Sequence, residues 1–348
     1  MVIGKSGRII PMSMDRSRGI KGLFLVIVSS VGLSQAQAQT IIKLGTIAPE
    51  GSVWHDALLE TRQRWREISA DEVELRIYAG GVLGGEEEMV RKMQRRGLDA
   101  LAVSGAGLPL IDDIVSCLNI PLLFNTYEEL ELARGSVAQE LESSFEASGF
   151  RVLSWAEAGW VHFFSKSPVT TPEDLRELRL WTSPGSPENE RMLKQLGFRV
   201  VPLPATDMLT GLQTGLIEAI DVPPLFALLD RSYQEAVFMT DLKFAPLVVG
   251  TVITSAAWDR LPAEHRPALL ASVQEIAGGL RTEVRRAEEE AVAEMVERGL
   301  TVVNLDAASA AAWRNTAEAI YPDLVCARDH PALFEKVLSV QRGAAQSP

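Results

Sequence analysis

Residues 41–104 read IIKLGTIAPEGSVWHDALLETRQRWREISADEVELRIYAGGVLGGEEEMVRKMQRRGLDALAVS, and this stretch decides the fold. Three short apolar runs in it predict strands, at 41–46, 73–78 and 98–104. Apolar residues at helical spacing predict two helices between the strands, at 53–68 and 86–96. Ser52 is in position to cap the first helix, and Gly97 to end the second. This β-α-β-α-β order is typical of a sheet with parallel crossovers.

The same order of elements recurs in residues 179–222. The expected strands lie at 179–182, 198–203 and 216–222, and the expected helices at 187–196 and 207–213. Two such units predict an α/β protein with two lobes. No long linker rich in Pro and Ser separates the lobes, so we expect the chain to cross between them more than once. Lobe I then comprises 39–163 plus about 248–280, and lobe II comprises 164–247 plus about 281–340.

Residues 262–299 are helix formers almost without interruption. A helix of this length spans roughly 50 Å at about 1.5 Å per residue, which exceeds one ordinary lobe. The pair Gly278-Gly279 is a weak point, because glycine disfavours the helix interior. The helix therefore either lies across both lobes or breaks at this pair.

The N-terminal residues 1–38 have the features of an export signal. Basic residues precede an apolar run at 23–33, and the small-x-small pattern Ala36-Gln37-Ala38 fits a signal peptidase site. The run is too short for a transmembrane helix, which needs about 20 residues. We therefore expect a periplasmic protein that begins at Gln39 after cleavage, without stable membrane insertion of the mature chain. The alternative is a retained membrane anchor.

The whole chain carries a formal net charge of −12, and residues 1–38 contain five basic residues and one acidic residue. Removal of these residues brings the charge to −16. This acidity argues against nucleic acid and against anionic lipid as partners.

The cysteines and histidines give no sign of a metal site. Cys117 and Cys326 either form a disulfide after export or remain two free buried thiols. The four histidines are scattered, with no His-x-x-x-His pair, and there is no Cys-x-x-Cys motif. We expect neither a metal nor another cofactor.

Motifs for catalysis are weak or missing in this sequence. There is no Gly-x-Ser-x-Gly motif and no P-loop, and Gly105-x-Gly107 continues to Leu110 where a dinucleotide fingerprint has its third glycine. The glycine-rich loop at 80–85 precedes three glutamates, which favour the helix N-terminus but repel anions. We therefore interpret this loop as a tight turn. An exported α/β enzyme remains as the alternative to a binding protein.

Four aromatic residues stand at or beside the C-terminal ends of expected strands: Trp54, Trp160, Trp181 and Phe226. In open α/β sheets, ligands bind in the crevice at these strand ends. Together the four favour a binding cleft. The other tryptophans, which we expect to pack inside elements, are Trp65, Trp155, Trp258 and Trp313.

Residues 196–203 (LGFRVVPL) and 209–218 (LTGLQTGLIE), followed by Pro223, resemble a known family. They are similar to the extracytoplasmic solute-binding proteins of TRAP transporters, the DctP family. Further matches lie at 44–46 and 78–84, so the resemblance covers about 41–334. It implies a clamshell of two α/β lobes like that of periplasmic binding proteins, with a long helix across both lobes. It also implies a small-molecule ligand, no catalysis, and the membrane subunits of a TRAP transporter as partners.

Two departures from the family pattern concern the ligand. Trp181 stands where typical members have an Arg that pairs with a substrate carboxylate, and Val222 stands where they have an Asn. Tryptophan cannot form the bidentate Arg–carboxylate pair. We therefore expect a partly hydrophobic ligand with a polar end held by Ser104, Thr182 or Ser183. Arg179 has the same strand parity as Trp181, so a slipped register and an organic acid or dicarboxylate remain as the alternative.

The complete set of expected ligand contacts is Trp54, Ser104, Gly105, Trp160, Arg179, Trp181, Ser183, Val222, Pro223 and Phe226. A sensor component would share the same fold and cleft, so the sequence leaves transport and sensing both open.

Overall fold

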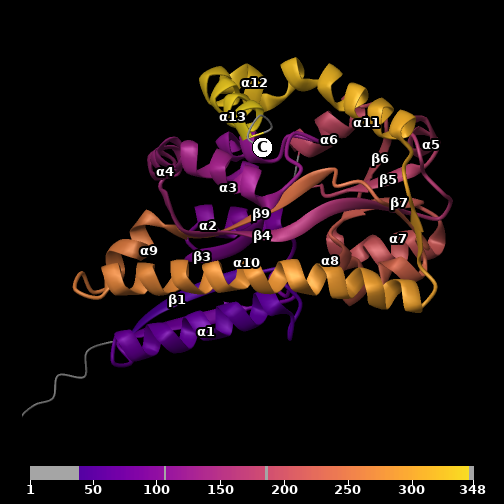
Figure 1. The fold of residues 1–348 in the computed structure, drawn as a ribbon. Helices are drawn as coiled ribbons and strands as arrows, with labels where there is room; N and C mark the ends of the chain where they lie inside the picture. Colours follow the sequence, from indigo (N-terminus) through magenta and orange to yellow (C-terminus); the bar gives the residue numbers. More distant parts are fainter. Residues whose placement is uncertain (1–38, 106, 185–186, 345–348) are drawn as a thin grey trace, which may run out of the picture. The chain divides into compact units, whose positions relative to one another are not determined.

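The computed structural model describes residues 39–105, 107–184 and 187–344. The expected signal peptide at 1–38 lies outside the described residues. Within the described part, ten strands form one mixed sheet. Eight of them follow the order β2-β1-β3-β9-β4-β7-β5-β6, and the two short strands β8 and β10 pair with each other beside β4. The helices lie around this sheet (Figure 1). The predicted α/β class is confirmed.

The first three strands form the parallel unit that the sequence predicts. They are β1 (Thr40–Thr46), β2 (Val73–Tyr78) and β3 (Ala100–Ser104), with β1 paired to both others in parallel. The crossover helices are α1 (Val53–Ile68) and α2 (Glu86–Gln94). The Ser52 hydroxyl accepts the backbone N–H of His55, so the predicted cap is confirmed.

The second parallel unit contains β5 (Arg179–Thr182), β6 (Arg199–Pro202) and β7 (Ala219–Val222). Its helices are α5 (Pro172–Arg176), α6 (Pro187–Gln195), α7 (Met208–Thr214) and α8 (Pro224–Leu229). Helix α7 ends at Gly215, which adopts a left-handed conformation with φ of 73°. The strands and helices expected between 179 and 222 are therefore present, with ends shifted by at most three residues.

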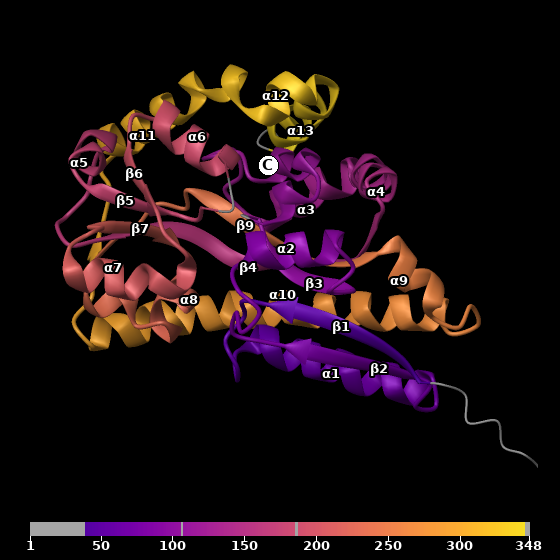
Figure 2. The ribbon, with the colours of Figure 1, turned by 180° about the vertical axis from the view of Figure 1, so that it is seen from behind.

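Two long antiparallel strands join the two units, and the sequence analysis gave bounds for neither. Strand β4 (Phe150–Ser165) pairs first with β9 (Ala245–Thr254) and then, at its C-terminal end, with β7 and β8 (Phe238–Thr240). Strand β9 lies between β3 and β4. Both strands run through the middle of the molecule in Figures 1 and 2. The chain therefore crosses between the lobes through the sheet itself.

Helix α10 (Arg266–Glu297) is continuous over 32 residues, or about 48 Å at 1.5 Å per residue. It contacts α1, β4 and α8, and Figure 1 shows it along both halves of the sheet. The predicted helix across both lobes is confirmed. It begins at Arg266 instead of 262, because a turn precedes it, and it does not break at Gly278-Gly279. The short helix α9 (Ser255–Arg260) precedes it.

The C-terminal helices return from one lobe to the other. Strand β10 (Thr301–Val303) pairs with β8, and α11 (Ala307–Ala319) contacts α5. Helix α12 (Val325–Asp329) instead contacts the 3-10 helix Asp113–Leu118. Helix α13 (Pro331–Ala344) contacts the same 3-10 helix and α3 (Tyr127–Ser136), which is followed by α4 (Ala138–Ala147). Residues 325–344 therefore pack on elements that we assigned to lobe I, and the exact lobe boundaries remain a prediction.

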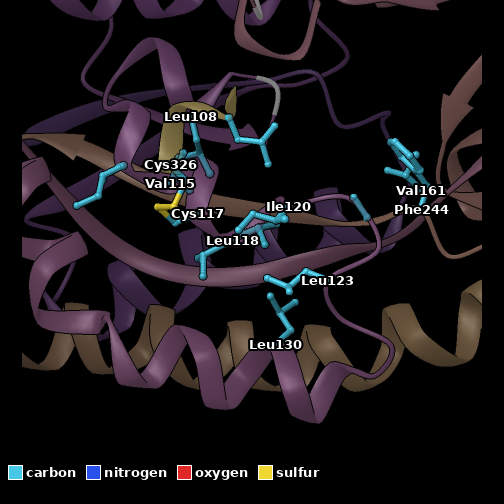
Figure 3. Packing of buried hydrophobic residues seen from close by; sticks show 14 of the residues in the cluster. Leu108, Val115, Cys117, Leu118, Ile120, Leu123, Leu130, Val161, Phe244 and Cys326 are labelled. Carbon is cyan, nitrogen blue, oxygen red and sulfur yellow. A yellow bond between two sulfur atoms is a disulfide. The ribbon is translucent and has the colours of Figure 1, made fainter. Parts of the chain in front are cut away.

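A disulfide links α12 to the 3-10 helix Asp113–Leu118. Cys117 and Cys326 are bonded, with their Cα atoms 4.9 Å apart, so the bonded state is the one present in the structure. Figure 3 shows the bond among buried side chains that include Leu118 and Val115.

The four tryptophans expected to pack inside elements are all buried: Trp65, Trp155, Trp258 and Trp313.

Candidate functional site

A cavity of about 190 Å³ lies at the C-terminal ends of β3, β5 and β7. Parallel strands direct their C-terminal ends to one edge of the sheet, where α/β proteins commonly bind ligands. Seven of the ten expected contacts line this first cavity: Ser104, Gly105, Trp181, Ser183, Val222, Pro223 and Phe226.

A second cavity of about 120 Å³ adjoins the first. It lies between α1, α10 and the strands β1, β3, β4 and β9. Trp54, an eighth expected contact, lines it together with Val273 and Ile276 of α10. The residues that line both cavities are Ile47, Ser104, Pro223, Phe226 and Leu247. The two cavities therefore meet at this shared wall.

Trp160 lies outside both cavities, contrary to our expectation. It is only 3% exposed, and its ring packs 5.4 Å from the ring of Tyr127. The cause is a bulge in β4. Three residue steps on β4, from Glu157 to Trp160, face two steps on β9, so the alternation of side chains reverses there.

Arg179 also lies outside both cavities. It stands at the N-terminal end of β5, where its guanidinium donates hydrogen bonds to the carbonyls of Gly215 and Leu216 and pairs with Glu218 at 3.2 Å. The cavity is at the other end of the strand. Trp181, two residues further along β5, is the residue of this strand that lines the first cavity, so Arg179 does not take its place.

Trp181 is held in place as part of the cavity wall. Its indole Nε1 donates to the carbonyl of Leu203 at 2.9 Å. The N–H is thus already used within the chain, so the indole presents its apolar ring surface to the first cavity.

Polar groups that the sequence analysis missed also line the first cavity. Ser116 Oγ, Asn119 Oδ1 and Asp221 Oδ1 are buried and have no hydrogen-bond partner among the described residues. Burial raises the pKa of Asp221 to about 8, although a hydrogen bond from Asn189 opposes the rise. Asp221 is next to Val222 in the sequence, and this adjacency is the signal that could have found it.

The charges of the first cavity are mostly acidic. Among its described lining residues, Arg191 is the one basic side chain, and Glu188, Asp221 and Asp323 are acidic. Arg191 forms an ion pair with Glu188, with Nη1 and Oε2 separated by 2.8 Å. A ligand carboxylate would therefore compete with Glu188 for this guanidinium.

Glu86 lies beside Ser104 where the two cavities meet. Its carboxylate accepts the backbone N–H of Ser104 at 2.6 Å and contacts the Ser104 hydroxyl at 2.7 Å. Burial raises the pKa of Glu86, and these two hydrogen bonds oppose the rise. This pairing holds the end of β3 against the first turn of α2.

Two searches over the described part of the chain bear on other functions. Its His, Cys, Asp and Glu side chains form no group of three or more that could hold a metal ion. In the same residues, every helix is too short or too polar to cross a membrane.

Comparisons with known proteins give consistent matches. The family model "Bacterial extracellular solute-binding protein, family 7" (DctP) matches residues 44–326. The 2,3-diketo-L-gulonate-binding periplasmic protein YiaO of Escherichia coli is 27% identical over 285 residues, which cover 81% of this chain and 86% of that relative.

Solved structures of TRAP periplasmic solute-binding proteins share the fold. One from Desulfovibrio salexigens with bound orotic acid has a TM-score of 0.81 at 19% identity, covering 88% of this chain and 99% of that one. Another, from Sulfurospirillum deleyianum with bound succinate, has a TM-score of 0.80 at 21% identity, covering 87% and 99%. The cavities described above thus lie in a fold that holds small organic acids in other proteins.

Proposed function

The chain belongs to the DctP family, the bacterial extracellular solute-binding proteins of family 7, and on this premise we propose that it is the ligand receptor of a TRAP-type transporter. It captures a small, partly hydrophobic ligand between its two lobes in the periplasm and delivers the ligand to the membrane subunits. Residues 1–38 direct its export, and the mature chain begins at Gln39. The homologues are binding proteins and not enzymes, which supports a receptor over the alternative of an exported enzyme.

The class of ligand is indicated by the part of the cavity wall that Trp181 and Val222 form. Both residues line the first cavity, and the Trp181 N–H is already bonded to Leu203. A buried carboxylate without a cationic partner costs several kcal/mol, whereas buried apolar surface gains about 25 cal/mol per Å². The wall therefore favours a ligand that covers it with apolar surface.

The polar end of the ligand both donates and accepts hydrogen bonds. Buried oxygens without a partner among the described residues belong to three residues that line the first cavity, Ser116, Asn119 and Asp221. The Asn119 oxygen accepts, whereas the Ser116 hydroxyl and the Asp221 carboxyl, whose pKa burial raises to about 8, also donate at neutral pH. A buried polar atom left without a partner costs about 1–3 kcal/mol, so a hydroxyl group of the ligand, which does both, is favoured at this place. Ser104 and Ser183 line the same cavity and supply further polar contacts.

Native mass spectrometry of the exported protein tests this proposal. The intact mass reports whether the chain starts at Gln39, and a co-purified ligand is released and identified in the same experiment. Calorimetry with succinate, an aromatic acid and a neutral hydrophobic alcohol then ranks the ligand classes. We expect the hydrophobic alcohol to bind best.

Organic acids remain the competing ligand class, because relatives of the same fold hold orotate and succinate. Arg191 is the residue that would pair with such a ligand, after release from Glu188. Micromolar binding of succinate that is lost in Arg191→Ala would contradict the hydrophobic ligand and leave the receptor function in place.

A further inference from the structure

We propose that the second cavity is a subsite for an apolar substituent of the ligand, whose polar end lies in the first cavity. This inference rests on the proposed receptor function and names the part of the molecule that selects the length of the ligand. The substituent passes the shared wall at Phe226 and enters the space between α1 and α10.

Small residues create the space. Residues with a short side chain or none line the second cavity on α1, α10, β3, β4 and β9, and these are Ala57, Ala102, Ala156, Ala158, Gly250 and Ala277. Larger apolar side chains, such as Leu58 of α1 and Ile276 of α10, close its sides. A cavity between two packed helices and a sheet loses the contacts that a close-packed interior would make, unless a ligand group supplies them.

The polar groups around this cavity are largely occupied. Thr61 Oγ1 donates to the carbonyl of Ala57 at 2.8 Å, Thr46 Oγ1 accepts the N–H of Ala48 at 3.1 Å, and the Glu86 carboxylate is bound by Ser104. Trp54 Nε1 is buried and has no partner among the described residues. The cavity therefore fits a hydrocarbon group, or a ring that carries one acceptor toward Trp54.

The volume limits the size of the substituent. An apolar cavity of about 150 Å³ stays dry and binds benzene in a protein interior. The second cavity, at about 120 Å³, is slightly smaller. It accordingly takes a single ring or a chain of about five carbons.

A series of straight-chain 1-alkanols, from butanol to decanol, tests the subsite by calorimetry or tryptophan fluorescence. Each methylene that enters an apolar site is worth about fourfold in affinity. The affinity of the protein should therefore rise with chain length and level off once the second cavity is full. Ala277→Leu fills the cavity from α10, and Ala57→Leu fills it from α1. Both substitutions should remove the gain in affinity from butanol to the longer alkanols.

Ala271→Leu is the matched control, because Ala271 is exposed on the same helix as Ala277 and lies outside the cavity. It should keep the full gain with chain length. If both filling variants gained as much affinity with alkanol chain length as the wild type does, the subsite would be overturned and the receptor function would stay intact. Absence of binding by every alkanol to the wild type, together with binding of succinate, would overturn the hydrophobic ligand and this inference with it.

Discussion

The carboxylate of Glu288 on α10 occupies the space in which Gly159 of β4 would carry a Cβ atom. A Cβ built on Gly159 would lie 2.2 Å from both carboxylate oxygens. The same carboxylate accepts the backbone N–H of Trp160 at 3.0 Å and that of Leu225 at 3.4 Å. One buried side chain thus joins the long helix to the bulge of β4 and to the start of α8, where the chain passes between the two lobes.

Gly159→Ala should destabilise the protein by about 2 kcal/mol or more. Gly159 has φ of 110°, a region that costs a residue with a Cβ about 1–3 kcal/mol, and the added methyl group would displace Glu288. Urea unfolding measures the change. Gly135→Ala on α3 is the control, since no atom lies within 4 Å of a Cβ there, and it should be neutral or stabilising by up to about 1 kcal/mol.

Glu288 should also make the stability depend on pH. Burial raises the pKa of Glu288 from 4.5 to about 7, so the folded state holds its proton to higher pH than the unfolded state. Stability from this group is then full below about pH 4.5 and falls as the pH rises toward 7, by about 3 kcal/mol in total.

Glu288→Gln should flatten this part of the stability curve, measured by urea unfolding at a series of pH values. Glu283→Gln, at an exposed position of the same helix, should leave the slope between pH 4.5 and 7 unchanged. An identical slope in wild type and Glu288→Gln would show that Glu288 does not titrate in this range.

The disulfide should contribute about 3–5 kcal/mol to the free energy of unfolding. Cys117 and Cys326 are separated by 209 residues, and closing so long a loop restricts the unfolded chain strongly. The double variant Cys117→Ala/Cys326→Ala should unfold at lower urea than the wild type. Reductant should bring the wild type close to the variant and have no effect on the variant itself.

Ala287→Pro should cost about 3 kcal/mol or more, because it removes a hydrogen bond inside α10. Ala287→Gly changes only helix propensity and should cost about 1 kcal/mol. The ratio of the two losses, read from thermal or urea unfolding, separates a broken helix from a weakened one. Unchanged stability and binding in the proline variant would show that α10 does not need to be continuous.

Trp181→Ala should weaken binding of a hydrophobic ligand roughly tenfold for each 60 Å² or so of ring that the ligand covers. Arg179→Ala, on the same strand, should leave the affinity within about twofold, since Arg179 lies outside both cavities. Calorimetry on both variants makes the comparison. Binding of succinate that is lost in Arg179→Ala and survives in Trp181→Ala would reverse these assignments.

The parts of the fold that depend on local sequence could be predicted. Helix α1 begins and ends at the expected residues, because Ser52 caps it and apolar residues recur at helical spacing. No bounds were predicted for β4 and β9, which pair over a long sequence distance. Strand β4 is buried at nearly every residue, and β9 has apolar residues such as Leu247 and Val249 at its half-buried positions as well. Continuous burial removes the alternation of apolar and polar residues that identifies a half-exposed strand.

The candidate site was predictable only in part, for geometric reasons. Trp181 and Val222 were placed correctly at strand ends, and both line the first cavity. Arg179 has the same parity as Trp181, but it lies two residues, or about 6.6 Å, toward the wrong end of the strand. The bulge at Gly159 reverses the direction of Trp160, and a register shift of this kind depends on a partner strand far away in the sequence.

Strand β9 occupies the place between β3 and β4 although it comes later in the chain than both. During synthesis, which proceeds from the N-terminus, β3 and β4 therefore exist for some time with their facing edges unpaired. Unpaired strand edges are sites of aggregation, and pairing over such distances is slow. We expect the emerging chain to depend on chaperones until residue 254 has been made, and any fragment that stops before 245 to lack the centre of its own sheet.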